Sequence, residues 1–268
     1  IVITHSLDES GVVAYSRLVV EANENSEVTI VERFVSSTNA KSLIVPVIDV
    51  RAAQSARVTY VAINELGTAT WQIGYQQAVG QRDSTMQMFT VALGGDYARV
   101  RAEVRLEGQG ASAQQVALYF ADENQMHDFR TLQDHAAPRT HSNLLFKGAV
   151  KDTAKSVYTG LIRIRENATK SEAFQTNRNL TLSNGAWAES VPNLEIETND
   201  VKCSHASTVG PIDEEQRFYL ESRGIQPEIA ERLVVLGFFD EVLNRLPALP
   251  FIAGLRERVS TKLLGAKS

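Results

Sequence analysis

Short stretches of alternating apolar and polar residues recur along residues 1–208 and constrain the fold more than any other feature of the sequence. Two of the clearest are Val100, Ala102, Val104, Leu106 and Val116, Leu118, Phe120. An alternation with a period of two places every second side chain on one face, which is typical of a strand with one buried face. We find no convincing helical periodicity in this part of the chain, so we predict a body made mainly of β-strands.

The spacing of these stretches indicates how the strands are arranged. They begin at long and fairly regular intervals, near Met86, Val100, Val116, Phe129, Leu144, Val157 and Phe174. Turns of a β-sandwich usually follow one another at shorter intervals, about 10 residues. Small residues precede several runs, as in Ser55-Ala56-Arg57-Val58 and Thr153-Ala154-Lys155-Ser156-Val157, and would let a coil turn a tight corner. This regularity favours a stacked β-solenoid, and an irregular antiparallel sandwich stays open as the alternative.

The pattern becomes helical after residue 208. Asp213 precedes two glutamates and a glutamine, which is typical of a helix N-cap and first turn. Gly224 is placed to end that helix, and Pro227 to open a second one. The buried faces that we expect on the second and third helices are Ile229, Leu233, Leu236, Leu243 and Leu246, and Ile252, Leu255, Val259 and Leu263. We therefore predict a β-helix core over residues 1–208 and a C-terminal helical subdomain over residues 209–268.

Composition excludes several classes of protein. The 268 residues carry a formal net charge of −5 and no long run of Lys or Arg, which argues against nonspecific nucleic-acid binding. The longest apolar run, Leu233 to Phe239, is far shorter than the roughly 20 residues of a membrane-spanning helix. No signal peptide is visible, so we expect a cytoplasmic protein that binds neither nucleic acid nor a membrane. The chain opens at Ile1 without a methionine, and we expect further sequence upstream.

Cys203 and His205 form the first candidate site. Cys203 is the single cysteine of the chain, so no intramolecular disulfide can form. In an extended strand, residues two apart point to the same side, and a thiolate beside an imidazole can bind iron, copper or zinc. Two ligands are too few for a closed metal site, so a partner would have to supply the others. The structural alternative is a buried free cysteine beside a hydrogen-bonded histidine.

Three further histidines, His127, His135 and His141, lie within one short segment, with Asp128 and Asp134 close by. Histidine and carboxylate side chains can form a metal or acid–base site, but the spacing of these histidines matches no recognised zinc motif. The alternative is that these histidines only hydrogen-bond backbone carbonyls in loops. The serine-hydrolase elbow and the glycine-rich phosphate-binding motifs are absent from the sequence.

Two long, ordered stretches of the sequence resemble the SufB/SufD family of iron–sulfur cluster assembly proteins. The first runs from Leu194 through Val201-Lys202-Cys203-Ser204-His205 to Ile225. The second comprises Asp134-His135-Ala136-Ala137-Pro138-Arg139-Thr140-His141-Ser142, Lys147-Gly148, Val157-Tyr158-Thr159-Gly160 and Gln175-Thr176-Asn177. Within the family, the chain is more similar to the SufD branch, because Leu220 stands where the SufB branch carries a functional cysteine. It departs from the family at Ala206-Ser207, where Gly-Ala is common.

The resemblance implies a right-handed parallel β-helix followed by an α-helical subdomain. It implies a scaffold subunit rather than an enzyme, which pairs with a SufB-like subunit through the β-helix and docks a SufC-like ABC ATPase through its C-terminal helices. An iron–sulfur cluster would form transiently on a site shared with the SufB-like partner, with His205 and Cys203 as this chain's metal ligands. The resemblance also associates reduced flavin with the full complex, although the chain has no flavin motif. It leaves open whether the isolated chain forms a homodimer.

Two alternative functions can be stated from the residues. A β-helix enzyme acting on acidic polysaccharide would need a groove of carboxylates and basic residues on one sheet face. A simple metal-binding module would need His127, His135 and His141 to lie close together in space.

Overall fold

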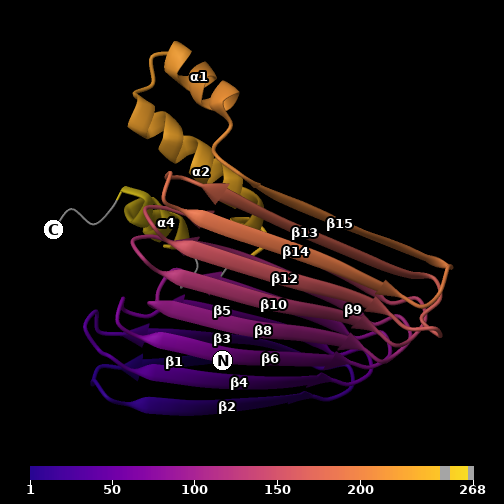
Figure 1. Ribbon diagram of the computed structural model, residues 1–268. Coiled ribbons are helices and arrows are strands. Elements are labelled where there is room, and N and C mark those ends of the chain that lie inside the picture. Colours follow the sequence, from indigo (N-terminus) through magenta and orange to yellow (C-terminus); the bar gives the residue numbers. More distant parts are fainter. Residues whose placement is uncertain (248–253, 265–268) are drawn as a thin grey trace.

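The computed structural model describes residues 1–247 and 254–264, which form a two-sheet β-solenoid and, at its C-terminal end, three helices (Figure 1). The strands alternate between the sheets, so each coil contributes one strand to each. Sheet A consists of β1 (Val2–Leu7), β3 (Glu27–Ser36), β5 (Arg57–Glu65), β7 (Thr85–Ala92), β9 (Ser112–Ala121), β11 (His141–Val150), β13 (Ser171–Thr181) and β15 (Val201–Gly210). Sheet B consists of β2 (Val13–Ala22), β4 (Leu43–Ala52), β6 (Trp71–Gly80), β8 (Tyr97–Leu106), β10 (Met126–His135), β12 (Lys155–Ile164) and β14 (Trp187–Ile196).

The strand register explains the spacing in the sequence. Neighbouring strands of each sheet are parallel, and one full coil carries the chain from a residue to its partner on the next strand, as from Ser112 to His141. The interval between successive apolar runs therefore corresponds to half a coil, which consists of one strand and one corner. The predicted mainly β chain with a parallel solenoid is confirmed, and the antiparallel sandwich is wrong.

Tight turns with small residues form the corners of the solenoid. Between β4 and β5, the amide of Ala56 donates to the carbonyl of Ala53 at 3.1 Å, and the Ala56 side chain is buried. The intervening Ser55 has a φ of 58°, the left-handed conformation that lets the chain reverse its path within a few residues. The small residues ahead of the strands thus have the predicted role.

Within the described residues, three helices follow the last strand: α1 (Glu214–Ser222), α2 (Pro227–Leu243) and α4 (Leu255–Leu264). The Asp213 side chain caps α1 by accepting from the amides of Glu215 at 2.9 Å and Gln216 at 3.3 Å. Gly224 follows α1 with a φ of 83°, and Pro227 is the first residue of α2, as predicted.

The expected buried face of α2 is wrong in part. Ile229 and Leu233 are exposed, whereas Leu236 and Leu243 are partly buried and Leu246, beyond the end of the helix, is buried. The fully buried residues of α2 are Ala230, Val235, Phe239 and Val242. Since α2 is apolar on most sides, its sequence does not single out one stripe. On α4 the expected Leu255, Val259 and Leu263 are buried, and Ile252 lies outside the described residues.

Helices α2 and α4 cover the outer face of sheet A. Val235 and Phe239 of α2 share one apolar cluster with residues of β3 to β11, and the Phe239 ring lies 6.4 Å from that of Phe120. The partly buried Lys262 of α4 donates to the carbonyl of Leu93 at 2.6 Å and forms an ion pair with Asp122. In Figure 1, α1 instead projects away from the solenoid.

The strands end at Gly210 and the helices begin at Glu214, close to the boundary expected at residue 208. The division into two domains stays a prediction. Among the described helices, none has the length and apolarity required to span a bilayer.

Candidate functional site at the end of the solenoid

Strand β15 carries Cys203 and His205 and is the last strand of sheet A. It pairs with β13 on one side and, within the described residues, leaves its other edge without a strand. Strand β14 ends sheet B in the same coil, so the described part of the solenoid is open at this end. Large apolar side chains of this end coil are exposed: Trp187, Val191, Leu194, Ile196 and Val209.

Cys203 and His205 lie on the inward side of β15. Cys203 pairs with Ala173 and packs against the buried apolar cluster that contains Ile162 and Ile164 of β12, which places its thiol toward the interior. His205 is two positions further along and shares that face. Because no described coil closes this end, His205 is exposed and Cys203 is half-buried. This arrangement agrees with the prediction that the Cys203 thiol and the His205 imidazole lie on the same face of a strand.

The thiol and the imidazole differ in their readiness to bind a metal. Burial raises the pKa of the Cys203 thiol, so at neutral pH a metal would have to displace its proton. The His205 ring is open to solvent and has no hydrogen-bond partner within the described structure. Among residues 1–247 and 254–264, no three His, Cys, Asp or Glu side chains are grouped to hold a metal ion. The pair is thus too small for a metal site by itself.

His135 belongs to a buried corner between β10 and β11. Its Nδ1 lies 2.7 Å from Thr140 Oγ1, and its Nε2 lies 2.7 Å from Ser142 Oγ. The neighbouring Asp134 accepts both Arg165 hydrogen bonds, at 2.9 and 2.7 Å. The Asp134–Ser142 stretch of the sequence therefore locks a corner of the solenoid.

The metal module built from three histidines is not supported. His127 and His135 lie at opposite ends of β10, which puts about 26 Å of extended chain between them. His127 Nε2 is 3.3 Å from the Gly94 carbonyl, and His141 is exposed, 3.7 Å from Glu172. Each of these histidines has its own local partner.

Stability should fall between pH 7 and pH 5 because of the two buried histidines. Burial lowers the pKa of His127 from its ordinary 6.5 to about 3 and that of His135 to about 4. Below pH 6.5 the unfolded chain binds protons that the folded chain does not, so the free energy of unfolding decreases as pH falls. We expect a loss of about 2 kcal/mol per histidine between pH 7 and pH 5.

Denaturant unfolding of the wild-type chain, His135→Gln and His141→Gln at the two pH values measures this effect. His135→Gln should show a smaller pH dependence, and His141→Gln the wild-type one. Equal slopes for all three proteins would contradict the assignment.

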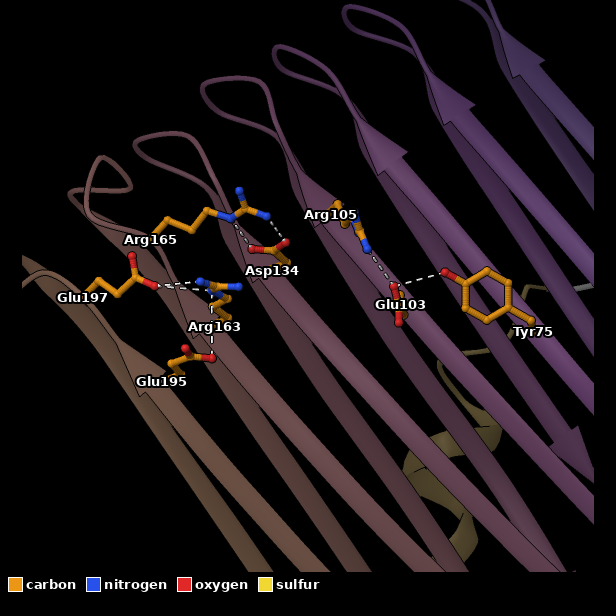
Figure 2. A network of polar contacts seen from close by, with 8 residues as sticks. All are labelled: Tyr75, Glu103, Arg105, Asp134, Arg163, Arg165, Glu195 and Glu197. Carbon is orange, nitrogen blue, oxygen red and sulfur yellow. Dashed lines mark hydrogen bonds and ion pairs between the residues drawn. The ribbon is translucent and has the colours of Figure 1, made fainter.

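A ladder of ion pairs crosses the outer face of sheet B near the ends of its strands (Figure 2). Arg163 reaches Glu197 at 3.0 Å and Glu195 at 3.9 Å, while Glu103 accepts from Arg105 at 3.2 Å and from the Tyr75 hydroxyl at 3.1 Å. These carboxylates are engaged with neighbouring arginines, several of them on the next coil. The ladder thus ties coils together and does not favour a polysaccharide-cleaving groove.

The sequence patterns did not single out the polar layer beneath the end coil. Gln175, Asn177 and Asn179 of β13 point inward and are buried, and Gln175 pairs in register with His205. The Ser207 hydroxyl bonds that of Ser190 at 2.7 Å and joins β15 to β14. Gln175 and His205 are separated in the sequence by the length of one coil, and this separation could have indicated that the two residues lie next to each other on adjacent strands.

The geometry defines a class of protein: a parallel β-solenoid with helices on one sheet, which presents a thiol and an imidazole at an open end. Comparison with known proteins specifies the class further. Residues 4–238 match the family model described as SUF system FeS cluster assembly, SufBD core domain. The chain belongs to this SufBD family.

Individual relatives agree with the family match. The chain is 41% identical over 262 residues to an iron–sulfur cluster assembly SufBD family protein of Mycobacterium tuberculosis, covering 94% of this chain and 64% of that protein. It is 32% identical over 235 residues to the iron–sulfur cluster assembly protein SufD of Bacillus subtilis, covering 87% and 54%. It is 29% identical over 250 residues to SufD of Escherichia coli, covering 93% and 58%. The chain thus spans between half and two-thirds of the length of these curated relatives.

Proposed function

We propose that this chain is the SufD-like subunit of a cytoplasmic SufB–SufC–SufD scaffold for iron–sulfur cluster assembly, without enzymatic activity of its own. It pairs with a SufB-like subunit through the open end of the solenoid and docks a SufC-like ABC ATPase on its helices. In this complex it supports nascent cluster formation and iron acquisition. The observation that carries the proposal is the exposed, inward-facing His205 beside Cys203, in a group of described residues too small to hold a metal.

The shape of the open end supports pairing with a second β-subunit. The edges of β14 and β15 offer unpaired backbone groups within the described structure, which invite another strand to pair. Exposed aliphatic side chains surround them, notably Leu194 and Ile196. A partner seated there would bury this apolar surface and bring its own ligands to His205, so that an iron–sulfur cluster is held as shared cargo. The same surface could also pair two copies of the isolated chain.

Leu194→Glu should prevent this pairing. A carboxylate at an interface core costs several kcal/mol when it is buried without a partner, but little when it stays in solvent. Ile73→Glu on the outer face of β6 is a matched control, because Ile73 is exposed to a similar degree, 41% against 39%. The tagged full-length protein with Leu194→Glu should recover at least ten-fold less SufB-like protein from native lysate than Ile73→Glu does. Equal recovery would place the interface elsewhere.

The surface of α1 supports docking of the ATPase. None of its residues is buried, and its Phe218 and Tyr219 are 71% and 58% exposed. Between α1 and α2 lies an open groove of about 950 Å³, lined in part by the apolar side chains of Leu220, Leu233 and Phe238. Aromatic side chains beside a groove are frequent anchors of protein interfaces.

Phe218→Ala should weaken ATPase binding without unfolding the chain. Truncating one exposed aromatic anchor removes about 2 kcal/mol of binding free energy, or roughly thirty-fold in affinity. Titration of the assembled complex with the SufC-like ATPase measures the change. Tyr15→Ala, which truncates a similarly exposed aromatic residue of β2, is the control and should bind normally. If both variants bind alike, the ATPase does not dock on α1.

A further inference from the structure

Gln175 carries a buried carboxamide without a hydrogen-bond partner among the described residues. The residue is 1% exposed, and neither its Oε1 nor its Nε2 is bonded. An unpaired buried amide costs about 1 to 3 kcal/mol, so such groups are rare and call for a reason. The neighbouring amides do not share this property, because Asn177 and Asn179 bond each other and the Tyr119 hydroxyl at 2.6 to 2.9 Å.

The strand register places this carboxamide directly below the candidate metal ligand. Gln175 of β13 and His205 of β15 are paired residues of adjacent parallel strands, and both side chains point inward. Paired residues of neighbouring strands are about 4.8 Å apart, a separation that a glutamine and a histidine side chain can close with a hydrogen bond. In the last described coil, His205 is the inward-facing residue that pairs in register with Gln175.

The opposite sheet leaves room for the carboxamide without binding it. Gly160 of β12 lies against the Gln175 Nε2, where any Cβ would overlap it. The nearby Tyr158 hydroxyl is engaged with Thr131 at 2.9 Å. The Gln175 side chain is therefore accommodated by Gly160 but bonded by no described residue of its own coil, which leaves the coil above as the place for a partner.

A metal-binding imidazole needs such a partner. When one ring nitrogen binds a metal, the other normally donates its N–H to an oxygen acceptor, which sets the tautomer and the ring orientation. The Gln175 Oε1 is an acceptor on the side of His205 that faces the preceding coil. The opposite side of the ring faces the open end of the solenoid, where a second subunit can bind.

We propose that Gln175 is a positioning residue. Its carbonyl oxygen accepts a hydrogen bond from the ring nitrogen of His205 that faces the preceding coil. The other ring nitrogen then carries no proton and faces the iron at the open end of the solenoid. This proposal rests on the function proposed above, but the bond itself does not require iron. Because the Gln175 carboxamide is unbonded in the structure, the bond requires both side chains to rotate about their χ angles. The arrangement gives the unpaired carboxamide its role.

The tautomer of His205 tests the proposal in the full-length protein without metal. Nitrogen-15 NMR of the histidine rings distinguishes the two neutral tautomers. We expect one dominant tautomer for His205 in the wild-type protein and a mixture in Gln175→Leu. Gln175→Glu keeps an acceptor oxygen and should retain the dominant tautomer. Gln115→Leu is the matched control, because Gln115 is a buried inward amide of sheet A with its own unpaired Oε1, two coils before Gln175.

An unchanged tautomer in Gln175→Leu, or an equal change in Gln115→Leu, would overturn the proposal. Iron(II) binding to the complex with the SufB-like partner gives the second measurement. Loss of the acceptor should weaken iron binding ten- to a hundred-fold, and an iron affinity that His205→Ala lowers but Gln175→Leu leaves unchanged would also overturn the proposal. A tautomer that responds to Gln175 in a complex where His205 binds no iron would contradict the proposed function and leave the positioning contact standing.

Discussion

His205→Ala is expected to abolish the contribution of this chain to cluster assembly. Activity of an iron–sulfur enzyme in cells that depend on the protein should fall at least ten-fold, to the level of cells without it. The expectation follows from the geometry, because His205 is exposed at the open end while burial keeps the neighbouring thiol protonated. Removing an exposed side chain changes the free energy of unfolding by about 0.5 kcal/mol or less, so the fold survives.

His141→Ala controls for a general effect of losing a histidine. His141 is also exposed, but it lies at the start of β11 on the outer side of the sheet, near Glu172. Its variant should support normal enzyme activity. Recovery of both variants in complex with the SufB-like and SufC-like partners shows that assembly of the subunits is intact. Normal activity of His205→Ala would remove the imidazole from the mechanism.

Gly148→Ala is expected to destabilise the chain by about 3 kcal/mol or more. A Cβ on Gly148 would overlap the ring of Tyr119, which is fully buried and cannot move away. The Tyr119 hydroxyl bonds Asn179 at 2.6 Å and receives a bond from Asn177 at 2.9 Å. The single methyl group would therefore break a buried hydrogen-bonded layer or push two coils apart. Thermal unfolding should show a midpoint lowered by about 10 °C.

Gly237→Ala provides the comparison for the same chemical change. Gly237 lies within α2, and a Cβ there would meet no atom within 4 Å. Alanine favours a helix over glycine by about 1 kcal/mol, so this variant should unfold at a slightly higher temperature than the wild type. Equal midpoints for Gly148→Ala and the wild type would show that the interior layer is loosely packed.

The fold could be predicted from the sequence because a solenoid repeats one local rule. Each alternating run forms a strand, and each small-residue segment, such as that around Ala56, forms a corner. The helices were located by local signals as well, since Asp213 and Pro227 act within a single turn. The buried face of α2 could not be predicted, because the choice between Leu233 and Phe239 depends on contacts with β9 and β11.

Only half of the candidate site was accessible to sequence reasoning. Cys203 and His205 stand two apart, and alternation along a strand suffices to place them on one face. Gln175 lies one coil earlier and meets His205 only through the register of two parallel strands. Lys147 belongs to the resembling stretches, but its bond to the Phe238 carbonyl at 2.9 Å joins distant parts of the chain. The first contact depends on the register of stacked coils, and the second on how α2 docks against sheet A.

The coordination of iron in the assembled complex tests the central claim most directly. Pulsed electron paramagnetic resonance of the iron-loaded complex with the SufB-like and SufC-like partners detects a nitrogen atom bound to the paramagnetic cluster. We expect an imidazole nitrogen signal in the wild-type complex that disappears in His205→Ala and is absent from this chain alone. The same nitrogen signal in His205→Ala would contradict the account, because the imidazole at the open end of the solenoid would not be the iron ligand.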